Sequence, residues 1–278
     1  MHIRVKHQTI YRYAEPVKAA VQRLLLTPRN FNGQHVRRWR IDVDRNCRLH
    51  QSEDAFGNIV HSFSIDGPFE TLSTLVEGDV ETFDTAGVVR GAIERFPPEL
   101  YLRETALTEP SDALRDFAQD ATRRETTPLA KMHALMGALH ETIAFDTDTT
   151  HSSTTAAEAF AHKSGVCQDF AHMFIAGARG FEIPARYVSG YFRRGDGDDD
   201  QTAGHAWAEA YVGEFGWIGF DPTNRQCPTD AYLRVATALD YLGAAPIRGA
   251  RTGGAGEVME VKVRVDMARS QTQSQTQS

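Results

Sequence analysis

The sequence predicts an α+β protein, in which an N-terminal antiparallel β-sandwich precedes a domain of helices packed on an antiparallel sheet. Two changes in hydrophobic period support this expectation. Through the first 95 residues apolar and polar residues alternate, which is the period of a half-buried strand. From residue 111 apolar residues recur every three or four positions, which is the period of an amphipathic helix. Strand-like runs return after Pro184, so a second sheet is expected beside the helices.

The first domain, residues 1–95, is expected to consist of short strands. Trp39, Ile41 and Val43 alternate with charged residues, so one face of that strand is buried and the other meets solvent. Residues 96–110 are rich in proline and are expected to link the two domains. Turn-forming pairs separate the strand-like runs at Asn32-Gly33, Gly57-Asn58, Gly67-Pro68 and Glu77-Gly78.

The second domain, residues 111–267, is expected to open with three helices whose starts carry capping residues. Ser111 can cap the first helix, and Thr127-Pro128 favours the start of the second, because proline suits the first helical position. Thr155-x-x-Glu158 matches a capping box before a short helix that ends near Lys163. The second helix carries one apolar stripe, formed by Leu129, Met132, Leu135, Met136, Leu139 and Ile143.

A fourth helix and several strands are expected to complete this domain. The helix begins near Cys167 and ends near Arg179, and strands follow at 185–192, 204–212 and 216–221. A last strand at 257–267 can pack on either domain. The tail, 268–278, ends in serine, glutamine and threonine only, and we expect it to be disordered because it has nothing to bury.

Composition narrows the functional classes. Thirty Lys and Arg residues against 37 Asp and Glu give a net charge of −7, which makes nucleic acid and anionic membranes poor partners. No apolar run is long enough to span a bilayer, and the N-terminus lacks the apolar block of a secretory signal, so we expect a cytoplasmic protein. Three scattered cysteines without a Cys-x-x-Cys pair disfavour both a disulfide framework and a zinc site, and no cofactor is expected.

One of these cysteines, Cys167, is placed where a thiolate is favoured. It falls in the first turn of the fourth predicted helix, where free backbone N–H groups and the helix dipole stabilise negative charge. Gly165, just before it, allows a tight turn. The alternative is a small buried apolar residue, which is the commonest fate of a free cysteine.

His205 is a candidate partner for this thiol. An imidazole can accept the thiol proton and later protonate a leaving amine. His205 begins a predicted strand in which it shares one face with Trp207, Glu209 and Tyr211. The alternative is a strand histidine with an ordinary hydrogen bond. Glu209 can serve the substrate or the histidine, or instead pair with an arginine such as Arg186.

Asp221 is a candidate to orient the imidazole. It follows His205 by 16 residues, so a hairpin pivoting at Gly213 places the two side chains opposite each other on one face. A carboxylate there holds the useful tautomer and stabilises the imidazolium. The alternative is that Asp221-Pro222 only ends a strand and begins a turn.

Three segments together resemble the signature of the bacterial transglutaminase-like superfamily. They are Gly-Val-Cys-Gln-Asp-Phe-Ala at 165–171, His-Ala-Trp-x-Glu at 205–209 and Gly-Trp-Ile-Gly-x-Asp-Pro-Thr-Asn at 216–224. The stretch 183–191 resembles a strand beside the site in these proteins. Tyr11-Arg12-Tyr13, Leu26-Thr27-Pro28-Arg29 and Asp54-Ala55-Phe56-Gly57-Asn58 resemble the β-rich region that precedes such domains in bacteria.

The resemblance implies a papain-like fold and a cysteine protease or amidase. It implies that Cys167 is the nucleophile, His205 the general base and acid, and Asp221 the orienting carboxylate. Gln168, Trp207, Glu209 and Tyr191 are then supporting or substrate-binding candidates, and the expected partner is a protein or peptide substrate.

Two features of animal transglutaminases are missing from the sequence. Those enzymes use a tryptophan upstream of the cysteine as a second donor to the oxyanion, and here no tryptophan lies between Trp39 and Trp207. Gln168 is one candidate for that donor. Animal enzymes also use calcium, but the acidic run 196–200 lacks the ligand spacing of a calcium loop and is expected to be a solvated loop.

Several functions remain open from the sequence. A thioester on Cys167 can pass to water, as in a peptidase or amidase, or to a lysine amine, as in a transglutaminase; hydrolysis is the default because water is always present. A non-catalytic scaffold is the alternative of another class. Metal binding by Cys167 and His205 needs further ligands, for which His162 and His172 are the nearest candidates.

Overall fold

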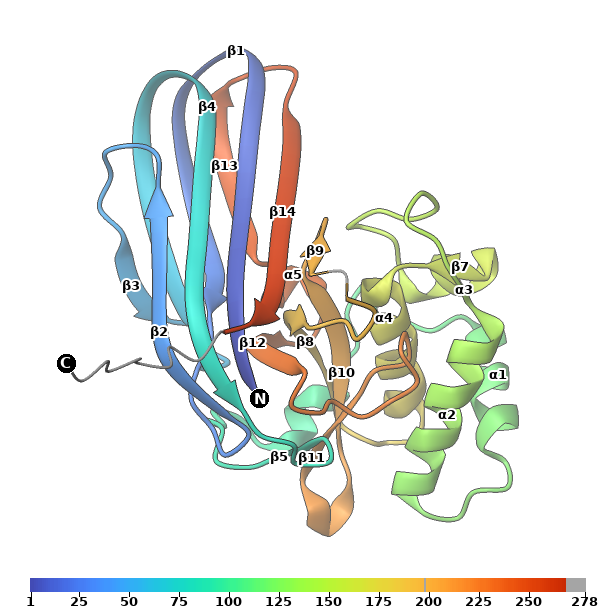
Figure 1. Cartoon of the computed structure of the whole chain (residues 1–278). Helices are drawn as coiled ribbons and strands as arrows, with labels where there is room; N and C mark the ends of the chain where they lie inside the picture. The colour runs from blue at the N-terminus through green and yellow to red at the C-terminus, as the bar shows by residue number, and fades with distance from the viewer. Residues whose placement is uncertain (198, 269–278) are drawn as a thin grey trace, which may run out of the picture.

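The computed structural model describes residues 1–197 and 199–268 and confirms a mixed α+β fold built on antiparallel sheets (Figure 1). Two units lie side by side: a tall sheet of long strands, and a smaller sheet covered by helices. The elements in chain order are β1 (His2–Thr27), β2 (Gln34–Val43), β3 (His50–Glu53), β4 (Ile59–Thr82), β5 (Val88–Val89), η1 (Pro98–Leu102), α1 (Asp112–Thr122), α2 (Pro128–Thr142), β6 (Ala144–Phe145), α3 (Ala156–His162), β7 (Ser164–Gly165), α4 (Cys167–Gly180), β8 (Ala185–Phe192), β9 (Asp200–Gln201), β10 (His205–Tyr211), η2 (Gly213–Phe215), β11 (Trp217–Phe220), β12 (Tyr232–Ala238), α5 (Tyr241–Ala244), β13 (Ile247–Gly253) and β14 (Val258–Met267).

The N-terminal strands are much longer than the sequence predicts. β1 has 26 residues and β4 has 24, and the two pair along nearly their whole length. The expectation of short strands was wrong because the turn-like pair Gly67-Pro68 lies inside β4 and does not end it. Figure 1 shows both strands bending over at the end of the sheet far from the chain's N-terminus.

This bend turns one sheet into two facing layers. The register of β1 against β4 shifts between Arg12 and Val17 and again before Ala19, next to Gly67 on the partner strand. Apolar side chains from both halves of the bent strands then fill the space between the layers. That core contains Tyr13, Val17, Ala20, Leu24, Leu26, Phe63, Ile65, Phe69, Leu72 and Val76.

The C-terminal strands complete the N-terminal sheet. β14 pairs with the first half of β1, from Ile3 to Arg12, and β13 pairs with its second half. Of the two alternatives for residues 257–267, packing on the N-terminal sheet is therefore the observed one. The predicted boundaries 1–95, 96–110 and 111–267 do not coincide with the two sheets. β5 lies within residues 1–95 but pairs with β11 in the smaller sheet, and β14 lies within residues 111–267 but pairs with β1.

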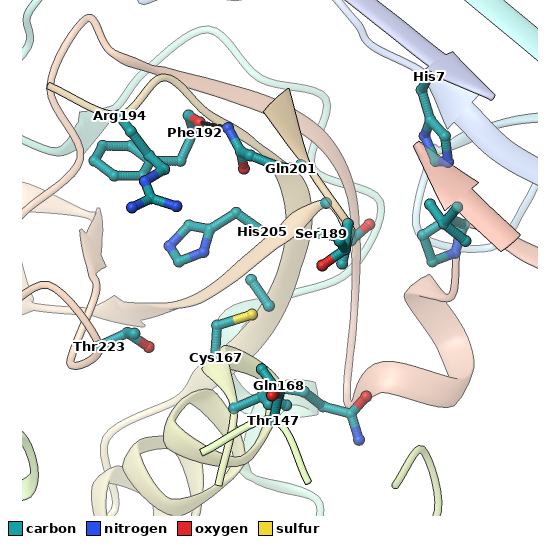
Figure 2. A pocket seen from close by; sticks show the side chains of 18 of the residues that line it. His7, Thr147, Cys167, Gln168, Ser189, Phe192, Arg194, Gln201, His205 and Thr223 are labelled. Atoms are coloured by element: carbon teal, nitrogen blue, oxygen red, sulfur yellow. Dashed lines mark hydrogen bonds between the residues drawn. The ribbon is translucent and has the colours of Figure 1, made fainter. Parts of the chain in front are cut away.

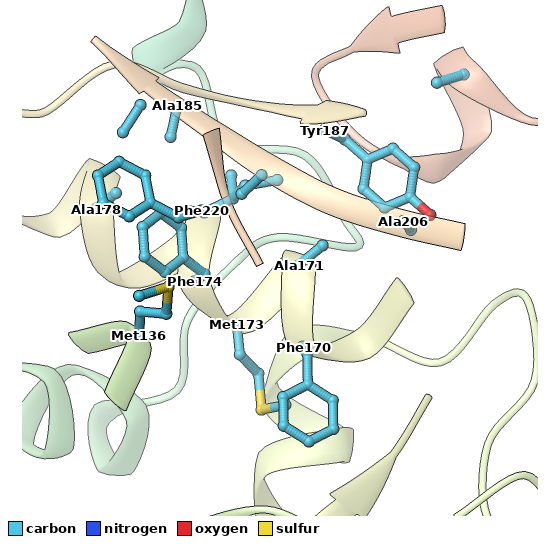
Figure 3. Packing of buried hydrophobic residues seen from close by; sticks show 14 of the residues in the cluster. Met136, Phe170, Ala171, Met173, Phe174, Ala178, Ala185, Tyr187, Ala206 and Phe220 are labelled. Carbon is cyan, nitrogen blue, oxygen red and sulfur yellow. The ribbon is translucent and has the colours of Figure 1, made fainter. Parts of the chain in front are cut away.

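The smaller sheet has the strand order β12-β8-β10-β11-β5 and is packed against helix α4. From Asp169 to Arg179 every residue of α4 is buried, because the sheet lies on one side and α1, α2 and α3 lie on the other. Figure 3 shows this packing, with Phe174 stacked on Phe220 of β11. The helix that carries Cys167 is thus the centre of its unit.

The predicted helix starts are confirmed by their caps. The Ser111 hydroxyl accepts from the Leu114 N–H, and the Thr127 hydroxyl accepts from the Ala130 N–H at the start of α2. Thr155 and Glu158 form the reciprocal capping box of α3. Each cap satisfies N–H groups that have no partner within the helix.

Two buried amides join the N-terminal sheet to β12. The Asn58 side chain donates to the Thr237 carbonyl and accepts from the Thr237 N–H. Gln34 makes the same pair of bonds with the backbone of Arg234. Asp54 fixes the first of these amides, because its carboxylate accepts from the backbone and side chain of Asn58. The Asp-Ala-Phe-Gly-Asn motif is therefore part of the junction between the two units.

The end of the acidic run 196–200 contacts β14, and residue 198 of the run lies outside the described residues. β9 pairs with Val263 and Arg264 of β14, and the Arg264 guanidinium forms ion pairs with Asp199 and Asp200. Of the tail 268–278, only Ala268 belongs to the described residues. None of the helices in the described part of the chain combines the length and the apolar character needed to cross a membrane.

Candidate active site

The thiol stands at the N-terminal end of the central helix. Cys167 is the first residue of α4, where backbone N–H groups have no intrahelical acceptor. The Asp169 carboxylate accepts from the Val166 N–H at 2.8 Å and from the Thr150 hydroxyl at 2.6 Å. A Cβ on Gly165 would meet the same carboxylate at 2.6 Å, so only glycine fits this approach.

The imidazole and the carboxylate meet as a hydrogen-bonded pair. His205 Nε2 lies 2.7 Å from Asp221 Oδ2. The register differs from the predicted hairpin, because Tyr211 pairs with Trp217 and the pivot falls one residue after Gly213. His205 and Asp221 still lie on one face but are diagonal neighbours rather than direct partners.

Asp221 is the most heavily hydrogen-bonded carboxylate of the site, and it is fully buried. Its Oδ1 accepts from the backbone N–H groups of Thr223 and Asn224. Its Oδ2 accepts from the Asn224 side chain and the Tyr232 hydroxyl, both at 2.7 Å. With His205 this makes five donors, which hold the carboxylate ionised and fixed in position.

The charges of the pair reinforce each other. Burial alone lowers the pKa of His205, but the Asp221 carboxylate outweighs it and, with a smaller contribution from Cys167, raises the pKa to about 10. Burial raises the pKa of Asp221, and the imidazole and its other donors lower it below the ordinary value. The geometry therefore favours an imidazolium beside a carboxylate.

This ring orientation leaves one nitrogen for the thiol. Because Nε2 donates to Asp221, Nδ1 is the nitrogen of His205 that remains for Cys167. Three rings, Phe192, Trp207 and Tyr232, surround the imidazole with centroids 5.4–6.1 Å away and restrict its rotation.

Cys167 and His205 open into one large cleft of about 1030 Å³ between the two units (Figure 2). The helix-and-sheet unit supplies the thiol, the imidazole and polar groups such as Gln168 and Thr223. The N-terminal sheet supplies the opposite wall, from neighbouring positions on β1 and β14. Those wall residues are His7, Thr9, Tyr11, Met259 and Val261.

The four supporting residues predicted from the sequence are distributed unevenly around the cleft. Gln168 lines it, but its amide donates to the Ser152 carbonyl at 3.3 Å. Trp207 lies behind the imidazole, buried against Tyr232. Tyr191 is buried at the junction of the two units, where its hydroxyl lies 2.8 Å from Nδ1 of His7.

Glu209 belongs to a separate buried ion cluster. Its carboxylate accepts from Arg186 at 2.7 Å and from Arg234 at 2.7 Å. Arg186 also binds Glu94, and its guanidinium lies 3.9 Å from the centre of the Trp217 ring. Of the alternatives for Glu209, the observed one is pairing with an arginine.

Other candidate groups lie apart from the pair. Burial raises the pKa of the Cys227 thiol to about 11, and burial lowers the pKa of His172 to about 4. His172 accepts a hydrogen bond from the Tyr241 N–H, and His162 is exposed. Within residues 1–197 and 199–268, no three metal-binding side chains gather.

Sequence reasoning missed the two side chains that fix Asp221. Asn224 stands in the third signature segment, so its position next to the aspartate was a usable signal. Tyr232 reaches the carboxylate from the start of β12, eleven residues away, after an irregular stretch. No period or motif links the two, so only the folded structure reveals this contact.

Two family models match this chain over separate residue ranges. Residues 115–222 match the Transglutaminase-like superfamily, and residues 3–81 match the Bacterial transglutaminase-like N-terminal region. A crystal structure described as a "Putative Cysteine Protease from Cytophaga hutchinsonii" is similar over 96% of this chain and 90% of that one, with a TM-score of 0.78. Sequence identity to it is 21%, so this likeness concerns the fold.

Similar sequences occur in several bacteria. An uncharacterized protein of Mycobacterium tuberculosis is 29% identical over 298 residues, covering 94% of this chain and 91% of that protein. One of Mycobacterium leprae is 29% identical over 95% of this chain and 98% of its own length. A protein-glutamine gamma-glutamyltransferase of Pseudomonas aeruginosa is 29% identical over 160 residues, which is 50% of this chain and 23% of that protein.

Proposed function

Since the chain joins a transglutaminase-like core to a bacterial transglutaminase-like N-terminal region, we propose that it is a thiol-dependent acyl-transfer enzyme that hydrolyses peptide or amide bonds. The observation that supports this most is the hydrogen bond between His205 and Asp221 in the cleft that also contains the Cys167 thiol. Nucleophile, base and orienting group are the three parts that covalent catalysis on an amide requires.

The first half-reaction forms a thioester. The His205 imidazolium already holds the thiol proton on Nδ1, and Sγ of Cys167 attacks the carbonyl carbon of the substrate. The C–N bond then breaks, and the imidazolium gives its proton to the leaving amine. Asp221 stabilises the imidazolium throughout and does not itself take the proton.

The second half-reaction consumes the thioester. His205 accepts a proton from water as the water oxygen attacks the carbonyl carbon, and Sγ leaves with the electrons of the C–S bond. The acid product and the free thiol result. The cleft is wide enough to admit water beside an acyl group, which favours hydrolysis.

Selective chemistry on Cys167 tests the proposal. Iodoacetamide labelling followed by mass spectrometry should modify Cys167 before Cys47 and Cys227, and Asp221→Asn should slow the labelling. An acyl adduct trapped on Cys167 from a peptide library would name the substrate. Labelling of Cys167 no faster than Cys47, together with a phenotype unchanged by Cys167→Ala, would favour the scaffold alternative.

Transamidation is a second candidate, favoured by the relative from Pseudomonas aeruginosa named as a gamma-glutamyltransferase. It shares the same thioester and differs only in the acceptor. Incubating the enzyme and a glutamine-containing protein with a fluorescent primary amine separates the two outcomes. Release of ammonia without incorporation of the amine indicates hydrolysis, and covalent incorporation indicates transamidation.

A further inference from the structure

The cleft that contains the thiol is also lined by a buried tyrosine whose hydroxyl bonds to no other described group. Tyr187 of β8 is 2% exposed and lines the same cleft as Cys167. Among the residues that the structure describes, its hydroxyl has no hydrogen-bond partner. The neighbouring buried tyrosines differ, because Tyr191 bonds with His7 and Tyr232 donates to Asp221.

The fold holds this ring firmly. Tyr187 pairs with Ala208 on β10 and Ala238 on β12, whose small side chains leave room for it. Its ring packs on His172 of α4 with centroids 5.2 Å apart, and Tyr241 of α5 meets it edge-on at 6.2 Å. Figure 3 shows the Tyr187 ring projecting from β8 with its hydroxyl at the far end.

The hydroxyl keeps its proton and can therefore donate a hydrogen bond. Burial raises the pKa of Tyr187 well above 10, and the next largest cause is the negative form of Cys167. The phenol therefore keeps its proton at any working pH, and it lines the same cleft as the sulfur. A fixed, neutral O–H group beside a nucleophile is suited to a charge that develops during the reaction.

We propose that the Tyr187 hydroxyl donates a hydrogen bond to the oxyanion of the acyl-transfer reaction, together with the backbone N–H of Cys167. This inference rests on the proposed function. No tryptophan lies between Trp39 and Trp207 to serve as the second donor to the oxyanion, and Tyr187 would take that role. Gln168 is less suited, because its amide donates to the Ser152 carbonyl.

In the acylation step Sγ forms the C–S bond while the carbonyl π pair moves to oxygen. The Tyr187 hydroxyl and the Cys167 N–H donate to that oxygen without losing their protons. When the C=O bond re-forms, the C–N bond breaks and His205 protonates the amine. Tyr187 thus contacts a reacting atom and is a catalytic residue in this proposal.

Two reactions of the same sulfur isolate this role. Acylation of Cys167 by p-nitrophenyl acetate passes through an oxyanion, and alkylation by iodoacetamide does not. Tyr187→Phe removes one oxygen and keeps the ring that packs on His172. We expect it to slow acylation about hundredfold to thousandfold, in line with the loss of one oxyanion donor, and to leave alkylation within about twofold.

Tyr241→Phe is the matched control, because Tyr241 lines the same cleft and contacts the Tyr187 ring. It should change neither rate more than about twofold. Equal acylation by the wild type and Tyr187→Phe would overturn the proposal, and so would a loss that follows Tyr241→Phe instead. Failure of wild-type Cys167 to react with either reagent would instead reject the proposed function.

Discussion

Strand β10 carries two buried ion clusters on one face, four residues apart, and they are built for opposite purposes. At one end the His205–Asp221 pair opens into the cleft, and one imidazole nitrogen remains for the thiol. At the other end Glu209 has both oxygens occupied by Arg186 and Arg234, and it lies outside that cleft. The first cluster leaves one nitrogen of His205 available for the reaction, and the second leaves no polar atom of Glu209 available.

The contrast between the two clusters shows which feature distinguishes a reactive site from a structural ion cluster. Both carboxylates have a lowered pKa, that of Glu209 to about 2, because cationic groups outweigh the effect of burial. A lowered carboxylate pKa alone therefore does not mark the reactive end. What marks it is a titratable partner with an unsatisfied nitrogen that faces a cavity.

The largest effect is expected from Asp221→Asn. The amide keeps the size of the side chain but loses the charge that stabilises the imidazolium, so kcat should fall by about 10²–10⁴-fold. The alkaline limb of the pH–rate profile should also move to lower pH, because Asp221 is the main cause that raises the pKa of His205. Steady-state kinetics across pH 6–10 measure both changes.

Asp54→Asn is the control for that substitution. Asp54 also accepts two backbone N–H groups in a tight turn, but it lies at the junction of the two units and not in the cleft. It should lower stability without moving the alkaline limb. An unshifted limb in Asp221→Asn would show that the carboxylate does not govern the imidazole.

The next largest effect is expected from Glu209→Gln, and on stability rather than on chemistry. Breaking a fully buried ion pair costs about 3–5 kcal/mol, because Arg186 and Arg234 lose a charged partner. Iodoacetamide labelling of Cys167 in the folded variant should keep the wild-type rate. Urea unfolding and labelling kinetics on the same preparation check the two statements.

Glu94→Gln supplies the comparison within the cluster. Glu94 binds the same guanidinium, but its side chain is 34% exposed, so its loss should cost at most about 1 kcal/mol. A Glu209→Gln variant no less stable than Glu94→Gln would mean that the buried cluster does not stabilise the fold.

These two ends of β10 were not equally accessible from the sequence. Cys167, His205 and Asp221 fall in compact segments whose residue types already indicate their chemistry. The structure places Cys167 and His205 in one cleft and bonds the buried Asp221 to His205. The diagonal register of His205 and Asp221 was missed, because the hairpin contains the short helix η2 at Gly213–Phe215 rather than a symmetric turn. Local alternation fixes which face a residue occupies but not the length of the turn.

Contacts between distant segments were beyond sequence reasoning. Arg234 reaches Glu209 across 25 residues, and His7 reaches Tyr191 across 184, and neither pair has a local signal. The same holds for the long bent strands, because a bend inside β1 leaves the same alternation and turn residues as a strand end. Tertiary packing decides between those two outcomes.

The smallest effect expected is a dependence of the unfolding free energy on pH. Its direction is opposite at the two ends of β10, because His205 stabilises the fold at low pH and Glu209 at high pH. A histidine whose folded pKa is about 10 holds a proton that the unfolded chain releases near pH 6.5, so stability is full below pH 6.5 and falls as pH rises toward 10. The measurement belongs in a Cys167→Ala background, where the thiol proton does not enter, and between pH 7 and 8, below most of the titration of tyrosines and of the other cysteines in the unfolded chain. Unfolding free energy should then fall by up to about 1.4 kcal/mol per pH unit.

Two added substitutions are the controls for this slope. Adding Asp221→Asn should flatten it. Adding Glu209→Gln should leave it unchanged, because the stabilisation from Glu209 is lost only as pH falls from about 4.5 toward 2. A flat profile in Cys167→Ala itself would mean that His205 is not held as an imidazolium, and the contrast between the two ends of β10 would lose its electrostatic basis.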